Sequence, residues 1–208
     1  PYELERKTVR DEFKLPPGII IAVLPGSRSS EIANLGPIFA NVAKLLISKY
    51  KDISFVAPMS SPETYNQFEQ CLNENCIREA FVLVKGHSHE MMVASNLVLL
   101  ASGTAALESA LLCRPTIAAY KLSMLSFFIL NKLVKIDSFT LPNILLKKEI
   151  IPEFIQNEAS VENLNKTICD FLNNQHDKEL IRNDSVLLKS KLNLDTDKLA
   201  ATEVLELL

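Results

Sequence analysis

Two short turns contain the residues whose types and spacing best suit chemistry. The first, Pro-Gly-Ser-Arg at residues 25–28, follows the apolar run Ile19–Leu24, and the second, Ser-Gly-Thr at residues 102–104, follows the apolar run Leu97–Ala101. When a buried strand ends in such a turn before a helix, free backbone N–H groups and the positive end of the helix dipole point toward the ligand, as in phosphate sites. The two turns together predict a site for a nucleotide sugar.

In the first turn, Gly26 allows the backbone to turn tightly and to approach a ligand closely. Ser27 is expected to cap the helix that follows. The guanidinium of Arg28 is a planar fork of donors, which suits a diphosphate. The alternative is an ordinary strand-to-helix turn with a solvated arginine.

In the second turn, the hydroxyls of Ser102 and Thr104 and the backbone N–H groups around Gly103 are expected to contact phosphate oxygens. Glu108 lies a little over one turn into the following helix, where it can accept hydrogen bonds from sugar hydroxyls. The alternatives are a capped helix without a ligand and, for Glu108, a surface carboxylate.

Two later segments supply weaker candidates. Asn143 follows Pro142, which is expected to end a strand over residues 138–141, and its neutral side chain can both donate and accept hydrogen bonds. Gln156 follows Pro-Glu at 152–153 and shares a helical turn with Glu153. Either segment alone also fits a common loop or a helix cap.

Composition limits the possible partners. The chain has 208 residues, 48% of them hydrophobic, enough for one compact domain. A net charge of −3, the absence of tryptophan and the lack of a long Lys/Arg block argue against nucleic acid. The cysteines and histidines show no metal-ligand spacing, so we expect reduced thiols and neither a metal nor a cofactor. The cysteines are Cys71, Cys76, Cys113 and Cys169.

Short apolar runs alternate with helical patterns, which predicts βαβ units and a Rossmann-like open parallel sheet of about six strands with flanking helices. Right-handed crossovers place all the strand-to-helix turns along one edge of such a sheet. The expected strands are 19–24, 53–57, 81–84, 97–101, 116–120 and 138–141, and the expected helices between them are 30–49, 62–75, 89–95 and 104–112.

Beyond residue 151 the pattern becomes purely helical, over 161–173, 177–191 and 196–208. The last of these has one apolar stripe, expected to pack on the sheet domain, on a missing partner half or on a second copy of the chain. We therefore expect an inter-domain connection at 1–15, a Rossmann-like domain at 16–156 and a helical tail at 157–208. The polar start, without a methionine, suggests a piece of a longer protein.

Residues 121–135 form the most apolar helix-length run, with lysines at both ends. A core helix covering the sheet is the commoner explanation; a membrane-interface helix and a groove for acyl chains are the alternatives. No apolar run reaches the ~20 residues that a membrane-spanning helix needs.

The motifs, taken together and in order, strongly resemble the C-terminal half of the lipid-A-disaccharide synthase family of inverting glycosyltransferases. The resemblance extends over about residues 15–160. The segments that carry it are Leu-Pro-Gly-Ser-Arg at 24–28 with Glu31, Ala-Ser-Gly-Thr-Ala-Ala-Leu-Glu at 101–108, Leu-Pro-Asn at 141–143, and Pro-Glu at 152–153 with Gln156.

The resemblance implies one half of a GT-B fold, the half that binds the donor nucleotide. It implies transfer from UDP-2,3-diacylglucosamine to 2,3-diacylglucosamine 1-phosphate, which releases UDP, in a cytoplasmic protein peripherally bound to the inner membrane. It also implies a donor site formed by the motif residues, with the general base in a first half that this sequence lacks. The roles it suggests are Arg28 on the pyrophosphate, Ser102 to Thr104 on phosphate, Glu108 on ribose, Asn143 near the transferred sugar and Gln156 around the UDP-sugar, with Arg28 and Asn143 as the catalytic candidates.

Two other functions remain open. One is a different GT-B enzyme that uses UDP-N-acetylglucosamine, such as a peptidoglycan transferase or an epimerase. The other is a folding or dimerisation module without catalysis, in which the last helix is exchanged between copies.

Overall fold

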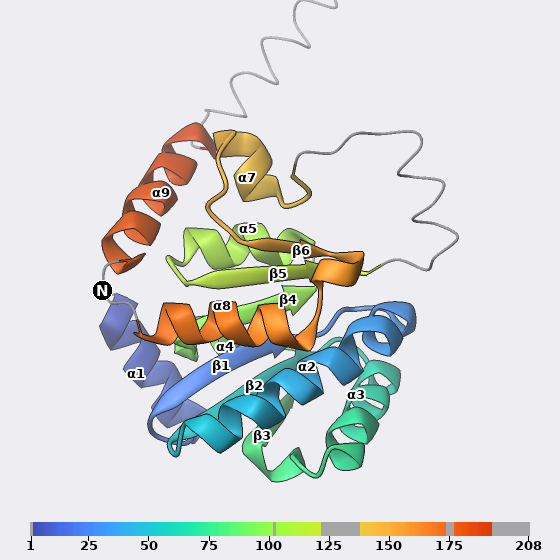
Figure 1. Ribbon diagram of the computed structural model, residues 1–208. Helices are drawn as coiled ribbons and strands as arrows, with labels where there is room; N and C mark the ends of the chain where they lie inside the picture. The colour runs from blue at the N-terminus through green and yellow to red at the C-terminus, as the bar shows by residue number, and fades with distance from the viewer. Residues whose placement is uncertain (1, 102, 122–137, 174–176, 193–208) are drawn as a thin grey trace, which may run out of the picture.

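A computed structural model describes residues 2–101, 103–121, 138–173 and 177–192 and shows a parallel sheet between two layers of helices (Figure 1). The strand order is β3-β2-β1-β4-β5-β6, and every neighbouring pair is parallel. The fold is therefore the Rossmann-like open sheet expected from the sequence. The strands are β1 Ile19–Leu24, β2 Ile53–Met59, β3 Phe81–Lys85, β4 Leu97–Ala101, β5 Thr116–Tyr120 and β6 Glu153–Ile155.

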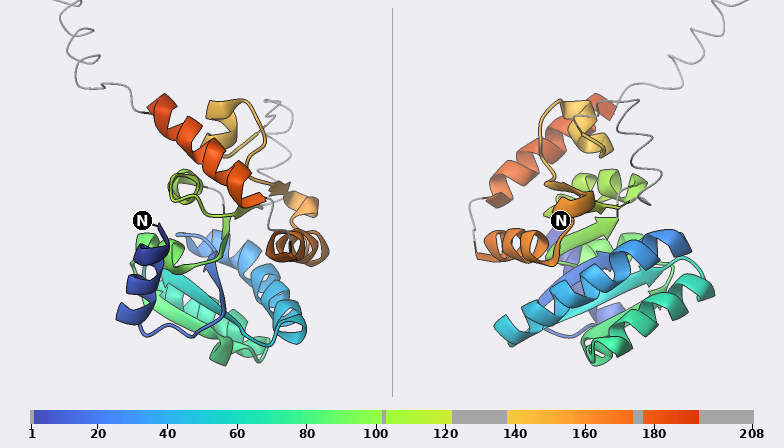
Figure 2. Two further views of the ribbon diagram at one scale, coloured as in Figure 1. Left: turned by 90° about the vertical axis from the view of Figure 1, so that its left-hand side faces the viewer. Right: turned by 45° about the vertical axis from the view of Figure 1, so that its right-hand side comes forward.

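Helices cover both faces of the sheet, and successive strand residues alternate between the two faces. Ile21 of β1 lies in the core with α2, α3 and α8, whereas Ile20 lies in the core with α4, α5 and α9 (Figure 2). The helices are α1 Tyr2–Glu12, α2 Ser29–Lys49, α3 Pro62–Glu74, α4 Ser88–Ala94, α5 Thr104–Leu111, α7 Leu141–Leu146, α8 Val161–Asn173 and α9 Asp177–Leu192, with 3₁₀ turns η1 Arg78–Ala80 and η2 Gln156–Glu158.

The order of the strands places a topological switch point between β1 and β4. From β1 the chain proceeds outward to β2 and β3, and then returns to β4 on the other side of β1. The carboxyl ends of β1 and β4 thus border the crevice in which open parallel sheets bind their ligands. The two turns singled out in the sequence follow these two strands.

The expected sixth strand at 138–141 is wrong. Residues from Leu141 onward form the helix α7, with Pro142 in its first turn, where a missing N–H and a fixed φ cost little. The sixth strand is β6, which pairs with β5 at the edge of the sheet. It has only three residues, the first of them a glutamate, so it has almost no apolar pattern.

The first fifteen residues, expected as a connection, contain α1, which packs against α4. Arg10 donates hydrogen bonds to the carbonyl of Ala94 (2.8 Å), to the carbonyl of Gly18 (3.1 Å) and to Oδ1 of Asn96 (2.8 Å). One charged side chain thus ties α1 to the amino-terminal edge of the sheet.

The expected helix at 196–208 lies outside the described residues, as does nearly all of the apolar run 121–135. None of the helices in the described ranges has the length and hydropathy needed to cross a bilayer.

Candidate nucleotide-binding site

A cleft of about 480 Å³ lies at the carboxyl edge of the sheet, and residues from both turns line it. Gly26, Ser27 and Arg28 come from the end of β1, and Gly103 and Thr104 come from the end of β4. The two turns therefore face one space, large enough for a ligand of nucleotide size. Ser102 lies outside the described residues, so its expected phosphate contact remains a prediction.

The first turn is closed by an acidic side chain from α2. The backbone N–H groups of Ser27 and Arg28 donate to Oε2 of Glu31 across 2.8 and 3.3 Å, and Nη1 of Arg28 donates to Oε1 across 3.0 Å. The N-cap of α2 is Arg28, so the expectation that Ser27 caps this helix is wrong. Glu31 accepts from the N–H of the N-cap residue Arg28, as the acid of a capping box does, and also from the N–H of Ser27.

Gly26 is required at this turn. Its φ is +131°, a conformation that residues with a side chain rarely adopt, and a Cβ there would lie 2.4 Å from Cβ of Glu31. By contrast, Arg28 is open to solvent, because its side chain is 78% exposed. The turn thus presents a guanidinium at the rim of the cleft.

The second turn leads directly into α5. The N-cap of α5 is Gly103, which supplies no side-chain cap, and the first two helical residues, Thr104 and Ala105, line the cleft. The N-terminal N–H groups of a helix lack intrahelical partners and carry the positive end of its dipole. This end of α5 is therefore suited to a phosphate group, and the hydroxyl of Thr104 adds a further donor.

Glu108 lies farther along α5 and is not among the residues that line the cleft. Its Oε1 lies 2.8 Å from Nδ1 of His89 on α4, and the two side chains are 40% and 58% exposed. No local sequence pattern pairs His89 with Glu108, since nineteen positions separate the two. The expected contact of Glu108 with ribose remains a prediction.

Asn143 does not line this cleft and is almost fully buried, with 1% exposure. Its Nδ2 donates to the carbonyl of Ile151 and to Oε1 of Glu153, both at 2.8 Å. Its Oδ1 accepts from the N–H groups of Ile150 (2.8 Å) and Ile151 (3.0 Å). All four hydrogen-bonding positions of the amide are thus used inside the protein, and none is left for a sugar.

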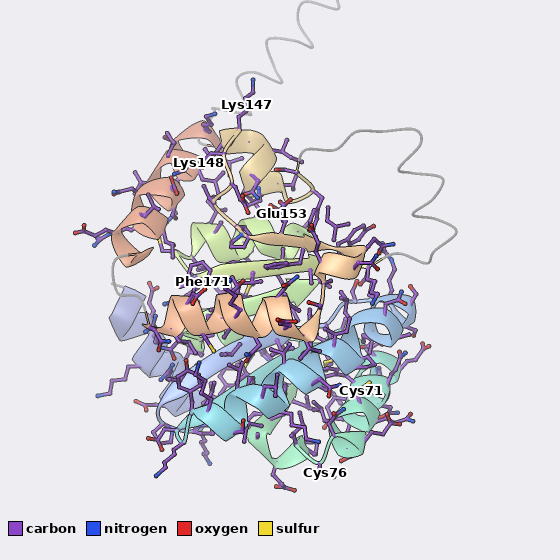
Figure 3. The ribbon with its side chains drawn as sticks, in the orientation of Figure 1. Cys71, Cys76, Lys147, Lys148, Glu153 and Phe171 are labelled. Atoms are coloured by element: carbon purple, nitrogen blue, oxygen red, sulfur yellow. The ribbon has the colours of Figure 1, made fainter. Side chains whose placement is uncertain are left out.

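Glu153 is the second member of this buried network, and Figure 3 shows it beside β6 and α7. Its carboxylate accepts from the N–H groups of Phe139 (3.0 Å) and Thr140 (2.9 Å) and from the hydroxyl of Thr140. Together with Asn143 it ties the start of α7 to the edge strand. Gln156, directly after β6, has a φ of +52° and does not line the cleft.

The cleft residues at the ends of β2 and β3 were missed in the sequence, among them Ser60, Gly86 and Ser88. The hydroxyl of Ser60 donates to the carbonyl of Ser27 (3.3 Å), and the N–H of Gly86 donates to the carbonyl of Met59 (2.9 Å). The expected sheet did indicate these residues, because the carboxyl ends of neighbouring parallel strands share one edge, and the residues after β2 and β3 therefore lie beside the two turns.

Within the described ranges, no group of three or more His, Cys, Asp or Glu residues could hold a metal ion. The cysteines in those ranges are free thiols.

The sequence is similar to one family model over nearly its whole length. The model described as lipid-A-disaccharide synthetase matches residues 2–204. A lipid-A-disaccharide synthase from Idiomarina loihiensis is 35% identical over 205 residues, and one from Pseudomonas fluorescens is 36% identical over 208 residues. These matches cover 98% and 100% of this chain but 54% of each relative. The chain thus spans about half the length of the curated relatives it matches.

Solved structures of low sequence identity share the fold. The C-terminal domain of a group 1 glycosyl transferase from Francisella tularensis has a TM-score of 0.65 at 14% identity, covering 91% of this chain and 94% of that domain. A complex of S. aureus MnaA with UDP has a TM-score of 0.55 at 14% identity, covering 81% of this chain and 40% of the other. At this level of identity, both comparisons show that the fold is shared.

Proposed function

Because the chain belongs to the lipid-A-disaccharide synthetase family, we propose that it forms the donor-binding half of a glycosyltransferase that makes the lipid A disaccharide. The donor would be UDP-2,3-diacylglucosamine, the acceptor 2,3-diacylglucosamine 1-phosphate, and the by-product UDP. The observation that carries the proposal is the shared cleft: Arg28 and the start of α5 face one space at the switch point of the sheet.

The role of the cleft is to bind the diphosphate and to stabilise it as it leaves. As the bond between the sugar and the diphosphate breaks, negative charge grows on the UDP oxygens. The Arg28 guanidinium and the N–H groups of Gly103 and Thr104 offer fixed positive potential to that charge. Such donors need no rearrangement during the reaction, which is why they favour the transition state over the ground state.

The other site residues take supporting roles in the proposal. Ser102 would donate to phosphate beside Thr104, Glu108 would accept from the ribose hydroxyls, and Gln156 would lie near the donor sugar. Asn143 was expected to contact that sugar and to act in catalysis. Since its hydrogen-bonding positions are all occupied, we propose a positioning role for Asn143 through β6 and the start of α7 instead.

Transfer to the acceptor also needs a general base to take the proton of the attacking hydroxyl. We propose that this base lies in the half of the relatives that this chain does not cover, so turnover is proposed only for the whole enzyme. The acylated substrates lead us to propose a peripheral site on the cytoplasmic face of the inner membrane. A homodimer formed through the C-terminal helices is a further proposal.

Calorimetric titration of this chain with UDP tests the donor site. We expect saturable binding to the wild-type chain and roughly 10-fold or greater weakening in Arg28→Ala, because a charge-assisted contact is lost. Absence of binding at millimolar UDP in a folded sample would contradict the proposal. In the whole enzyme, comparing acylated with non-acylated donors distinguishes lipid A synthesis from an enzyme that uses UDP-N-acetylglucosamine.

A further inference from the structure

Glu31 places a carboxylate inside the turn that was expected to bind a phosphate. Its two oxygens accept from two backbone N–H groups and from the guanidinium of Arg28, over distances of 2.8 to 3.3 Å. The side chain is 22% exposed, against 78% for Arg28, so the acid is the more firmly held member of the pair. Glu31 also lines the cleft.

The turn is shaped around this carboxylate. A Cβ on Gly26 would lie 2.6 Å from Oε2 of Glu31 as well as 2.4 Å from its Cβ, so only glycine permits the approach. The atoms that a Cβ on Gly26 would meet all belong to Glu31. The position of Glu31 is therefore enough to explain the glycine of this motif, without any ligand.

The arrangement divides the donors of the first turn into two groups. The N–H groups of Ser27 and Arg28 are engaged by Glu31 and are not available to a phosphate. The guanidinium has five N–H donors, and the ion pair with Glu31 uses one of them. The remaining donors of Arg28 can receive an anion while the ion pair stays formed.

We propose, on the basis of the donor site described above, that Glu31 is a positioning residue for the diphosphate. It closes the first turn and holds the guanidinium of Arg28 at the rim of the cleft. Arg28 and the N–H groups at the start of α5 then bind the diphosphate, whereas the N–H groups of the first turn do not. A mobile arginine would lose more conformational entropy on binding, and prior orientation by Glu31 reduces that loss.

The same contacts fit an opposite role, in which Glu31 competes with the diphosphate and must leave the turn when the donor binds. The two roles predict effects of opposite sign. Removing a competitor strengthens UDP binding, whereas removing a positioning residue weakens it.

The test is a double-mutant cycle measured by calorimetric titration with UDP. We expect Glu31→Gln to weaken UDP binding by roughly three- to tenfold in the wild-type background and by less than twofold in the Arg28→Ala background, because Glu31 acts through Arg28. Glu31→Asp, which keeps the charge but shortens the side chain, should show the same coupling. Glu63→Gln is the matched control: Glu63 accepts from the hydroxyl of Ser29 (2.7 Å) and does not line the cleft. It should leave UDP affinity unchanged.

Thermal unfolding of each variant separates binding from stability. Unchanged or tighter UDP binding in Glu31→Gln would overturn the proposed role and leave the donor site intact. An equal loss in both backgrounds would also overturn it, since Glu31 would then act on the turn and not on Arg28. If the wild-type chain bound no UDP, the donor site itself would be wrong, and this role with it.

Discussion

Asn143 donates a hydrogen bond to Glu153 across 2.8 Å, and through this contact the first turn of α7 is tied to the edge strand β6. Both residues belong to short motifs that suggested direct contact with a sugar. The structure shows instead a buried polar network in which the amide is fully satisfied and the carboxylate accepts from two backbone N–H groups. Such networks stabilise one arrangement of the chain strongly because unpaired members are costly.

We expect Asn143→Ala to reduce the free energy of unfolding by about 2–4 kcal/mol, because it leaves the N–H groups of Ile150 and Ile151 without their acceptor. Urea unfolding measures the loss. Asn41→Ala is the control, since Asn41 is exposed and donates to the carbonyl of Pro37 within α2. UDP affinity of the folded variant should stay close to wild type. If Asn143→Ala had normal stability and bound no UDP, the result would contradict the structural role and support a direct contact of Asn143 with the donor.

Gly26→Ala should be much more destabilising than Gly86→Ala. Gly86 has a φ of +69°, in the left-handed region, where an alanine costs about 1–2 kcal/mol. Gly26 has a φ of +131°, outside that region, and its added Cβ would also collide with Glu31, whereas nothing lies within 4 Å of a Cβ on Gly86. The difference in urea midpoint between the two variants measures the backbone strain and the collision together. Equal midpoints would show that Glu31 moves away at little cost.

Apolar runs located most of the sheet because they reflect burial on both faces. The first five strands were found by this signal, within two residues at each end, and the two glycine-containing turns were correctly placed at one edge. β6 was missed because it has only three residues. Its first residue, Glu153, is held by hydrogen bonds from residues 139 and 140, and contacts at that separation leave no local sequence pattern. α1 was missed because its sequence is mostly polar, and part of its docking comes from the hydrogen bonds of Arg10 to distant residues.

The candidate site was harder to predict from the sequence than the sheet was. Sequence patterns identify which residues follow a strand, but they do not show which side chains fill one another's hydrogen-bonding positions. The pair Arg28 with Glu31 is three residues apart at the start of α2, where a local pattern can show it, whereas the pair Glu108 with His89 joins two helices and only the fold shows it. Asn143 was misread because an amide that suits a sugar suits a protein backbone equally well.

The stability of the fold should depend on Glu90 at acidic pH. A hydrogen bond from its own backbone N–H and one from His87 hold the pKa of Glu90 below its ordinary value of 4.5. Because the pKa of Glu90 is lower in the folded state, its ionised carboxylate stabilises the fold at pH values above the ordinary pKa of 4.5. This contribution is lost as the pH falls through the pKa of the folded state. Below about pH 4.5, the melting temperature of Glu90→Gln should therefore fall less per pH unit than that of the wild-type chain. Parallel curves across pH 3–6 would contradict the prediction.

Thr104→Val tests whether the start of α5 contacts the diphosphate. Valine has nearly the shape of threonine but lacks the hydroxyl, so the helix N-terminus and its N–H groups are preserved. We expect UDP affinity to fall by roughly tenfold or more, the value of one hydrogen bond to a charged group. Thr167→Val is the control, because Thr167 is half-buried on α8, does not line the cleft, and donates to the carbonyl of Asn163 in its own helix (3.0 Å). It should change UDP affinity by less than twofold. Equal affinities for the two variants would mean that the hydroxyl of Thr104 faces the cleft without touching the ligand.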